Sequence, residues 1–214
     1  MTVEAEPHRA LVDPEVRAEL PGLELWTLAA RGADGRSTRA LRARLKELAG
    51  RWTGARAIAV RSQPVAHAYR VAFRQLGLDP DEERPPLEAA VLRRLEKGGF
   101  PSRGRLRDAL LLALLDTGVG VWTLDAAAVE GELALRQARH GERLGEGELA
   151  PDLPEGRLVV ADDRGPAAVL FGRVADDRVP TQETEGVVLF AVRVEGVPEL
   201  HVEEALFRAA DDLA

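Results

Sequence analysis

The residue types that most often perform chemistry are few in this chain and widely spaced. None of the four histidines lies three or four residues from another, so their spacing does not predict a zinc site; they are His8, His67, His140 and His201. There is no cysteine, which excludes thiol catalysis, thiolate metal sites and disulfides. The serines lack a nucleophile-elbow context, and no phosphate-binding loop of the Walker or dinucleotide type is present. We therefore expect neither a metal nor a cofactor.

Two pairs of adjacent acidic residues, Asp162-Asp163 and Asp176-Asp177, offer oxygen ligands of the kind that magnesium prefers. Adjacent aspartates in loops are more often turn residues, because their side chains hydrogen-bond to the nearby backbone. We interpret both pairs as turns.

Positive charge is concentrated in one stretch. The chain carries a net charge of −7, yet residues 36–61 hold eight Lys and Arg against the single Glu47, a net +7 that leaves −14 for the rest. A local basic face on an acidic protein can dock one phosphate backbone without binding every polyanion. Such a face would contain Arg39, Arg42 and Lys46, opposite the apolar stripe of a helix for which Ser37 is the predicted N-cap. The alternative is an ordinary solvated helix face in an arginine-rich protein.

Residues 62–100 predict two short helices joined by a rigid elbow. Val65, Tyr69 and Phe73 fall on one helical face, and three prolines between positions 80 and 86 prevent either helix from continuing. The second helix carries an acidic residue in its first turn and basic residues near its end, which suits the macrodipole. We expect Arg70, Glu88 and Arg94 to form an ion network at this elbow.

The pattern along the chain is helical first and strand-rich second. After a strand at 23–31 come helices up to residue 116, and from residue 120 short strand-like runs are separated by glycine and proline. A final helix at 199–213 would place Leu200, Ala205 or Glu204, Phe207 and Leu213 along one side. This segregated order predicts an α+β fold rather than an alternating parallel one.

No stretch of the sequence predicts membrane insertion. The longest apolar run, residues 109–115, is far shorter than the roughly 20 residues that a helix needs to span a bilayer. The first ten residues are charged and contain a proline, unlike a signal peptide. We expect a cytoplasmic protein without a membrane partner.

A longer motif carries a family resemblance. The spacing AYRxxFRxLGLDPxxxRPxxEAxxxRR at residues 68–94 resembles the tRNA-editing domain of the phenylalanyl-tRNA synthetase β subunit, the B3/B4 module, and most of all the freestanding proteins built from that module. The resemblance continues in the second half and extends over about residues 12–195; the matching positions there are Asp108, Gly118, Asp125, Arg136, Ala138, Gly141 and Glu142.

The resemblance implies a three-layer β/β/α arrangement. Together with the pattern of the residues, it divides the chain into a flexible N-terminus at 1–11, a B3/B4-like domain at 12–195 that follows the extent of the resemblance, and a C-terminal helix at 196–214 that we expect to pack on the same domain.

The resemblance further implies a pocket, whose polar groups are replaced here. The family's Asn, His and Glu positions correspond to Leu111, Trp122 and Phe190, and Gly118 and Gly120 would let a ligand approach the backbone. The polar residues expected near the pocket, mainly to brace the strands, are Asp108, Asp125, Arg136 and Glu142.

Three functions remain open at this point. The first is trans-editing, in which the protein binds aminoacylated tRNA and a positioned water hydrolyses the ester of a misacylated one. Backbone N–H groups could stabilise the oxyanion in that reaction. The second is noncatalytic binding of tRNA or of an amino-acid-like small molecule. The third is a degenerate editing domain retained for interaction with a partner. No DNA partner is expected.

Overall fold

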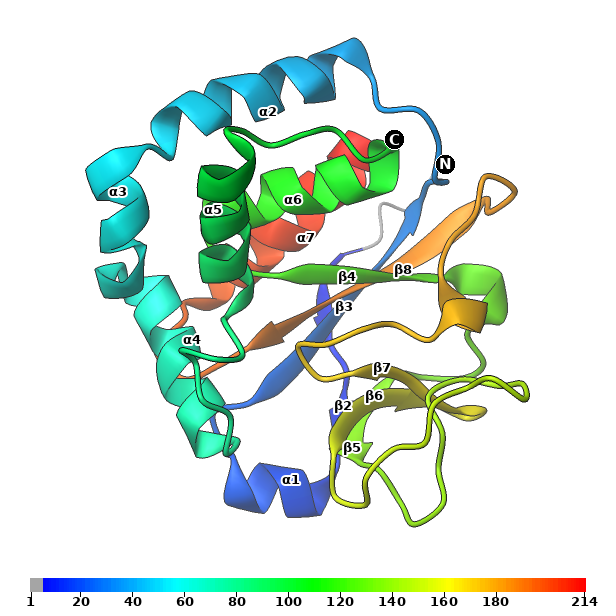
Figure 1. The fold of residues 1–214 in the computed structure, drawn as a ribbon. Helices are drawn as coiled ribbons and strands as arrows, with labels where there is room; N and C mark the ends of the chain where they lie inside the picture. Colours follow the sequence, from blue (N-terminus) through cyan, green and yellow to red (C-terminus); the bar gives the residue numbers. More distant parts are fainter. Residues whose placement is uncertain (1–5) are drawn as a thin grey trace.

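Two four-stranded sheets and a layer of helices make up the protein (Figure 1). The computed structural model describes residues 6–214. One sheet is covered by the second sheet on one face and by helices on the other, and helices dominate up to residue 117 while most strands follow. The predicted α+β fold is thereby confirmed.

The first sheet is antiparallel throughout and is centred on the longest strands. Its order is β1 (His8–Arg9), β3 (Glu24–Arg31), β8 (Gly186–Arg193) and β4 (Val121–Asp125). Strand β8 pairs with β3 on one side and with β4 on the other, so it joins segments from both halves of the chain. These strands are rich in Val, Leu and Ala, as expected for a sheet covered on both faces.

The second sheet is formed by β2 (Leu11–Val12), β5 (Ala134–Gln137), β6 (Leu158–Asp162) and β7 (Gly165–Val169), in that order. Strand β2 runs parallel to β5, whereas the other two pairings are antiparallel. Part of the segment predicted as a flexible N-terminus, residues 1–11, therefore contributes β1 and the first residue of β2; residues 1–5 lie outside the described residues.

Seven α-helices and three short 3₁₀ turns complete the part of the chain from residue 6 onward. Their bounds are α1 Pro14–Glu19, α2 Arg39–Arg51, α3 Gly54–Ile58, α4 Pro64–Gln75, α5 Pro86–Lys97, α6 Arg105–Thr117 and α7 Glu199–Leu213, with η1 Ala59–Ser62, η2 Ala126–Ala128 and η3 Asp176–Arg178. Helix α7 packs on β3 and β8 and runs beside α6, which also contacts α2 and α5. Each of these helices is too short or too polar to cross a bilayer.

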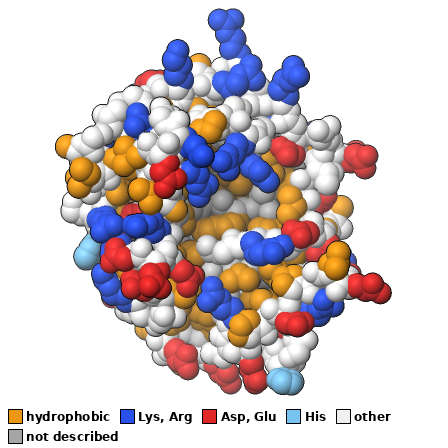
Figure 2. Space-filling view, viewed as in Figure 1, with side chains coloured by type: hydrophobic (Ala, Val, Ile, Leu, Met, Phe, Trp, Pro, Cys, Tyr) orange, Lys and Arg blue, Asp and Glu red, His pale blue; other side chains and the backbone are white. Residues whose placement is uncertain are grey.

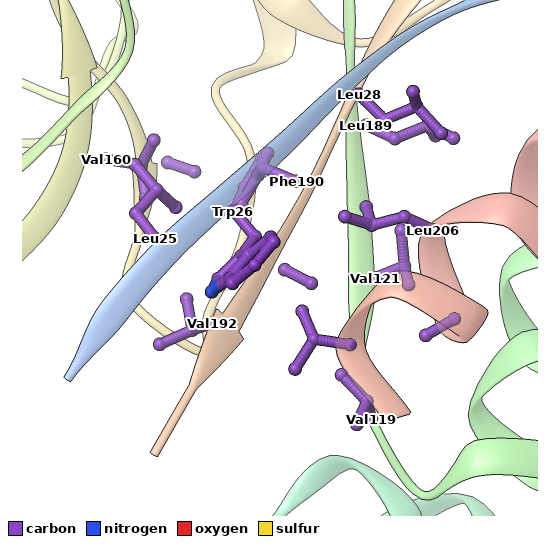
Figure 3. Packing of buried hydrophobic residues seen from close by; sticks show 14 of the residues in the cluster. Leu25, Trp26, Leu28, Val119, Val121, Val160, Leu189, Phe190, Val192 and Leu206 are labelled. Carbon is purple, nitrogen blue, oxygen red and sulfur yellow. The ribbon is translucent and has the colours of Figure 1, made fainter. Parts of the chain in front are cut away.

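The main core follows the alternation of side chains along the strands (Figure 3). Leu25 of β3 points toward Val160 of the second sheet, whereas Leu28 and Leu189 point toward Leu206 on α7. A separate apolar cluster lies among α2, η1, α5 and α6 and includes Leu45 and Leu112. The helices are therefore held both to the sheet and to one another.

Two local expectations differ from the structure. Helix α2 is capped by Thr38, whose Oγ1 accepts from the Leu41 N–H at 3.2 Å, and Ser37 is buried before it. Of the residues predicted to share one side of α7, Leu200 and Phe207 are 69% and 44% exposed, whereas Ala205 and Leu213 are buried. The packed face of α7 instead contains residues such as Val202 and Leu206, because the direction of the sheet selects which apolar stripe is covered.

The elbow between α4 and α5 is held by a buried ion network. The Arg70 guanidinium donates to Glu88 at 2.9 Å and to Asp81 at 3.0 Å, and the side chains of Arg70 and Glu88 are only 8% and 3% exposed. Arg61 lies 3.5 Å from Glu88. The predicted pairing of Arg70 with Glu88 is confirmed, but Arg94 is not part of the network. It donates instead to the Ala49 carbonyl of α2, because its position on α5 faces away from α4.

A second buried ion pair joins the turns at one end of the two sheets. Arg178 donates to Asp162 at 2.6 Å, with both side chains almost fully buried, and also donates to the Ala128 carbonyl. Burial by itself raises the pKa of the Asp162 carboxyl, but hydrogen bonds from Arg178 and from the Glu130 N–H lower it, and the net pKa lies below its ordinary value. Asp162 therefore favours its charged form in the folded protein.

Replacing Glu88 with Ala should lower the free energy of unfolding by about 3–5 kcal/mol, because Arg70 would lose its buried partner. For a chain of this length, that loss corresponds to a fall in melting temperature of roughly 6–20 °C. Thermal melting of Glu88→Ala and Arg94→Ala checks the assignment. Equal losses in the two variants would contradict it, since Arg94 contributes one hydrogen bond outside the network.

Acid should remove the stabilisation that Asp162 provides. Its folded-state pKa lies below the unfolded value of about 3.9, so the pair stabilises fully above that pH and loses its effect as the pH falls through the folded-state pKa. We expect Asp162→Asn to be less stable at pH 7 and to lose less stability between pH 5 and pH 3 than the wild type. Urea unfolding across this range measures both curves, and parallel curves would contradict the prediction.

Candidate functional site

Trp122 and Phe190, predicted to line a pocket, stack on each other. Their ring centroids are 5.8 Å apart with an interplanar angle of 14°, and the Trp122 Nε1–H donates to the Gly172 carbonyl at 3.0 Å. The two residues are register partners on β4 and β8 and therefore point to the same side of the sheet. Phe190 is 2% exposed and Trp122 is partly buried. The aromatic rings themselves occupy this part of the space between the sheets.

Phe171, which the sequence analysis did not identify, completes the aromatic cluster. Its ring stacks on Phe73 at 5.0 Å, meets Tyr69 edge-on at 5.8 Å and lies 6.1 Å from Trp122. Its backbone adopts a left-handed conformation, with φ of 56°, that is uncommon for a bulky residue. The turn after β7 therefore holds the Phe171 ring against α4, and no sequence pattern signals a positive φ at a phenylalanine.

The two predicted glycines permit close packing. A Cβ on Gly120 would lie 2.9 Å from the Trp122 ring, and a Cβ on Gly118 would lie 3.0 Å from Val65 Cγ1. Gly118 also has φ of 81°, which ends α6. Both glycines thus let side chains of the protein approach the backbone at the positions where the family resemblance implies a ligand.

The four predicted polar residues are all engaged in internal hydrogen bonds. Arg136 and Glu142 form a bidentate salt bridge with N–O distances of 2.7 and 2.8 Å. The Arg136 guanidinium holds the pKa of the Glu142 carboxyl below its usual range, although burial opposes this effect. Asp125 accepts from the Thr184 hydroxyl and from a backbone N–H. Asp108 accepts from the Ser102 hydroxyl at 2.5 Å and from the Arg103 N–H at 2.9 Å. These hydrogen bonds fix turns and strand ends.

Leu111 lies apart from the aromatic cluster, at a hollow between α5 and α6. The hollow has a volume of about 320 Å³ and is closed on one side by the segment that connects the two helices. Its apolar surface includes Leu110 and Leu111 of α6, Ala90 of α5, and Phe100 and Pro101 of the connection. The structure therefore separates Leu111 from Trp122 and Phe190, which belong to a different hydrophobic cluster.

Basic side chains line this hollow, and Figure 2 shows Lys and Arg side chains in the region of α5 and α6. The lining cations are Arg93, Arg94, Lys97, Arg103 and Arg107, and the one lining carboxylate is Asp108. Among the described residues, only Arg94 of these five cations has a side-chain hydrogen bond, and none has a carboxylate within 4.0 Å. By contrast, arginines elsewhere, such as Arg44 and Arg208, are paired.

The predicted RNA-facing residues lie on the exposed side of α2. Arg39, Arg42 and Lys46 are all exposed. Arg42 and Lys46 line a second hollow of about 400 Å³ between α2 and the end of α5, together with Lys97. This hollow shares Lys97, Gly99, Phe100 and Pro101 with the first one. The basic face of α2 is thus continuous with the hollow between α5 and α6.

The basic rim could have been found from the sequence. On α5, Ala90, Arg93, Arg94 and Lys97 follow the i, i+3, i+4, i+7 spacing of one helical face, and Arg103 and Arg107 are four residues apart. What the sequence does not indicate is that α5 and α6 turn these faces toward each other.

The chain is similar to part of the phenylalanine–tRNA ligase β subunit. The chain is 36% identical over 85 residues to the phenylalanine–tRNA ligase β subunit of Chromobacterium violaceum, covering 39% of this chain and 11% of that protein. It is 31% identical over 126 residues to the corresponding subunit of Streptomyces avermitilis, covering 58% of this chain and 15% of that protein. The chain therefore spans less than a sixth of the length of these curated relatives. No protein-family model matches the chain.

Replacing Trp122 with Ala should destabilise the protein by about 3 kcal/mol, toward the lower end for buried aromatic residues because Trp122 is only partly buried. The change would remove its stacking on Phe190 and its hydrogen bond to Gly172. Trp122→Phe retains a stacking ring and should lose less. Chemical unfolding compares the stability of the three proteins. An unchanged stability of Trp122→Ala would show that the ring is dispensable for packing, and Trp122 would then be a candidate for contact with a ligand.

Proposed function

We propose that this chain binds aminoacyl-tRNA and hydrolyses the ester of a misacylated tRNA in trans, as a freestanding editing domain of the B3/B4 type. The observation that carries the proposal is the continuous basic face formed by α2 and the hollow between α5 and α6. Similarity to phenylalanine–tRNA ligase β subunits supports an RNA partner that is a tRNA.

The basic face suits RNA because its charge is local. The chain as a whole carries a net charge of −7, so it repels polyanions over most of its surface. Exposed Arg42 and Lys46 on α2 line a hollow together with Lys97 of α5, and exposed Arg39 lies one turn before Arg42 on the same helix. These side chains form a positive strip on an acidic background. Phosphate contacts of this kind supply most of the affinity for a nucleic-acid backbone and position it.

Hydrolysis of an aminoacyl ester needs little from the protein's side chains. The ester is already activated, so cleavage requires an oriented water and donors for the oxyanion, and backbone N–H groups can provide these donors. The neighbouring ribose hydroxyl of the tRNA is a further candidate to assist the attack. This mechanism assigns orientation to the protein and assigns no side chain as a general base.

A second candidate function is noncatalytic binding of tRNA or of an amino-acid-like molecule. It is favoured by the internal engagement of Asp108, Asp125 and Glu142, whose carboxylates are held by hydrogen bonds within the protein. The aromatic rings that occupy the space near β4 also favour it. Under this function the same basic face would hold the tRNA without cleaving it.

A deacylation assay across a set of misacylated tRNAs separates the two functions. The trans-editing proposal expects accelerated ester cleavage with at least one of these substrates, and a mixture without protein provides the reference rate. Tight binding of the same tRNAs with no acceleration would overturn trans-editing and support the noncatalytic function.

Charge reversal on α2 tests the RNA-binding face. The triple variant Arg39→Glu, Arg42→Glu and Lys46→Glu should weaken tRNA binding by at least tenfold at low salt, because three side chains that attract phosphate would repel it. The dependence of log affinity on log salt should flatten by roughly 0.7–0.9 of a unit for each phosphate that the variant no longer neutralises. These three residues are exposed, so thermal melting should be nearly unchanged. Equal tRNA affinity in the variant and the wild type would exclude this surface.

A further inference from the structure

We propose that the hollow between α5 and α6 is a nucleotide site, in which the basic rim binds a phosphate and Phe100 stacks against the adjacent base. This inference deepens the proposed function and rests on it for the identity of the partner as RNA. The phosphate site itself stands on the cations, the shape and the apolar surface of the hollow.

The basic rim is suited to a phosphate because its cations are not neutralised by the protein. Arg93 and Lys97 project from α5, Arg103 and Arg107 lie at the start of α6, and none of the four has a carboxylate within 4.0 Å among residues 6–214. The Asp108 carboxylate in the wall is already occupied, since its two oxygens accept from Ser102 and from the Arg103 N–H. Guanidinium groups bind phosphate oxygens through paired N–H donors.

The arrangement is unfavourable when no anion is present. Arg93 and Lys97 are four residues apart on α5, so like charges lie together on this wall of the hollow. Like charges at this spacing destabilise a helix. On the other wall, Arg103 precedes α6 and Arg107 lies in its first turn. A bound phosphate would attract each of these cations and so offset the repulsion between them. Binding of an anion therefore accounts for a cluster that helix stability alone does not favour.

The surface behind the cations is apolar and includes one aromatic ring. Leu110, Leu111 and Ala90 line the hollow together with Phe100 and Pro101, and Phe100 is only partly buried. Bases of single-stranded nucleic acids stack on aromatic side chains beside positively charged grooves. The volume of about 320 Å³ is at the small end of the roughly 300–1,000 Å³ typical of ligand sites, which fits one nucleotide better than several.

The hollow opens toward the basic face of α2. Lys97 and Phe100 belong both to this hollow and to the second one, which Arg42 and Lys46 also line. A single strand that leaves the nucleotide site would therefore meet further cations along α2. This continuity favours the end of an RNA strand over an isolated nucleotide, although the phosphate chemistry is common to both.

Binding of small probes to the full chain tests the site. The probes are a labelled single-stranded RNA tetranucleotide, a nucleoside 5′-monophosphate and the same nucleoside without phosphate. We expect Arg93→Gln with Arg107→Gln to weaken binding of the tetranucleotide and of the monophosphate at least tenfold. Phe100→Ala should also weaken binding, and Phe100→Tyr should restore it. The matched control is Arg17→Gln with Arg74→Gln, two exposed arginines without ion pairs among the described residues, and it should bind like the wild type.

The three probes distinguish the sources of phosphate and the two proposals. Tighter binding of the tetranucleotide than of the monophosphate supports a strand end, and equal binding supports a free nucleotide in the same site. Equal affinity of wild type and Arg93→Gln/Arg107→Gln, or of nucleotide and nucleoside, would overturn the inference even if tRNA binds through α2. Phosphate-dependent binding of the monophosphate without any binding of tRNA would instead retain the site and reject the proposed function.

Discussion

The buried ion pair between Arg70 and Glu88 is the constraint on which the rest of the basic surface depends. It fixes α5 against α4 across the proline elbow, and α5 in turn provides one wall of the hollow and part of the second cluster of apolar residues. Two charges taken out of water must stay paired, because an unpaired partner costs several kcal/mol. The pairing therefore contributes to holding α5 in the position from which it packs on α6 and lines the hollow.

Helix α4 is also fixed to the sheet, so the elbow is not an isolated feature. The Tyr69 hydroxyl donates to the Val192 carbonyl of β8 at 2.7 Å, and burial raises the pKa of this hydroxyl. At the opposite end of β8, the pair of Arg178 and Asp162 joins turns that follow strands of both sheets. The two polar contacts anchor elements that meet otherwise through apolar packing, which is non-directional. Hydrogen bonds thus supply the orientation that hydrophobic burial does not.

The polar residues of this protein divide into those that the fold uses and those that it leaves free. Asp108, Asp125, Arg136 and Glu142 lie at turns or strand ends and are satisfied by neighbours. At the hollow between α5 and α6, the side chains of Arg93, Lys97, Arg103 and Arg107 lack such partners among the described residues, whereas Arg94 donates to the Ala49 carbonyl. A charged group without a partner inside the protein is a stronger sign of a binding surface than a charged group in a salt bridge. A salt bridge already gives the charged group a structural role. By this criterion the helical face is a stronger candidate for a binding surface than the space between the sheets.

The sequence by itself determined most of the longer helices and strands, the largely helical first half and the elbow, because periodicity, proline and glycine act locally. It also identified Arg70 with Glu88. It did not predict the short strands β1 and β2 near the N-terminus. Only the tertiary structure decided that Arg94 turns to α2, that Leu200 stays exposed, and that Trp122 stacks on Phe190. Each of these outcomes depends on which elements meet across long sequence separations. The hollow at Leu111 is of the same kind: its cations are visible in the sequence at helical spacing, but their convergence exists only once α5 and α6 pack together.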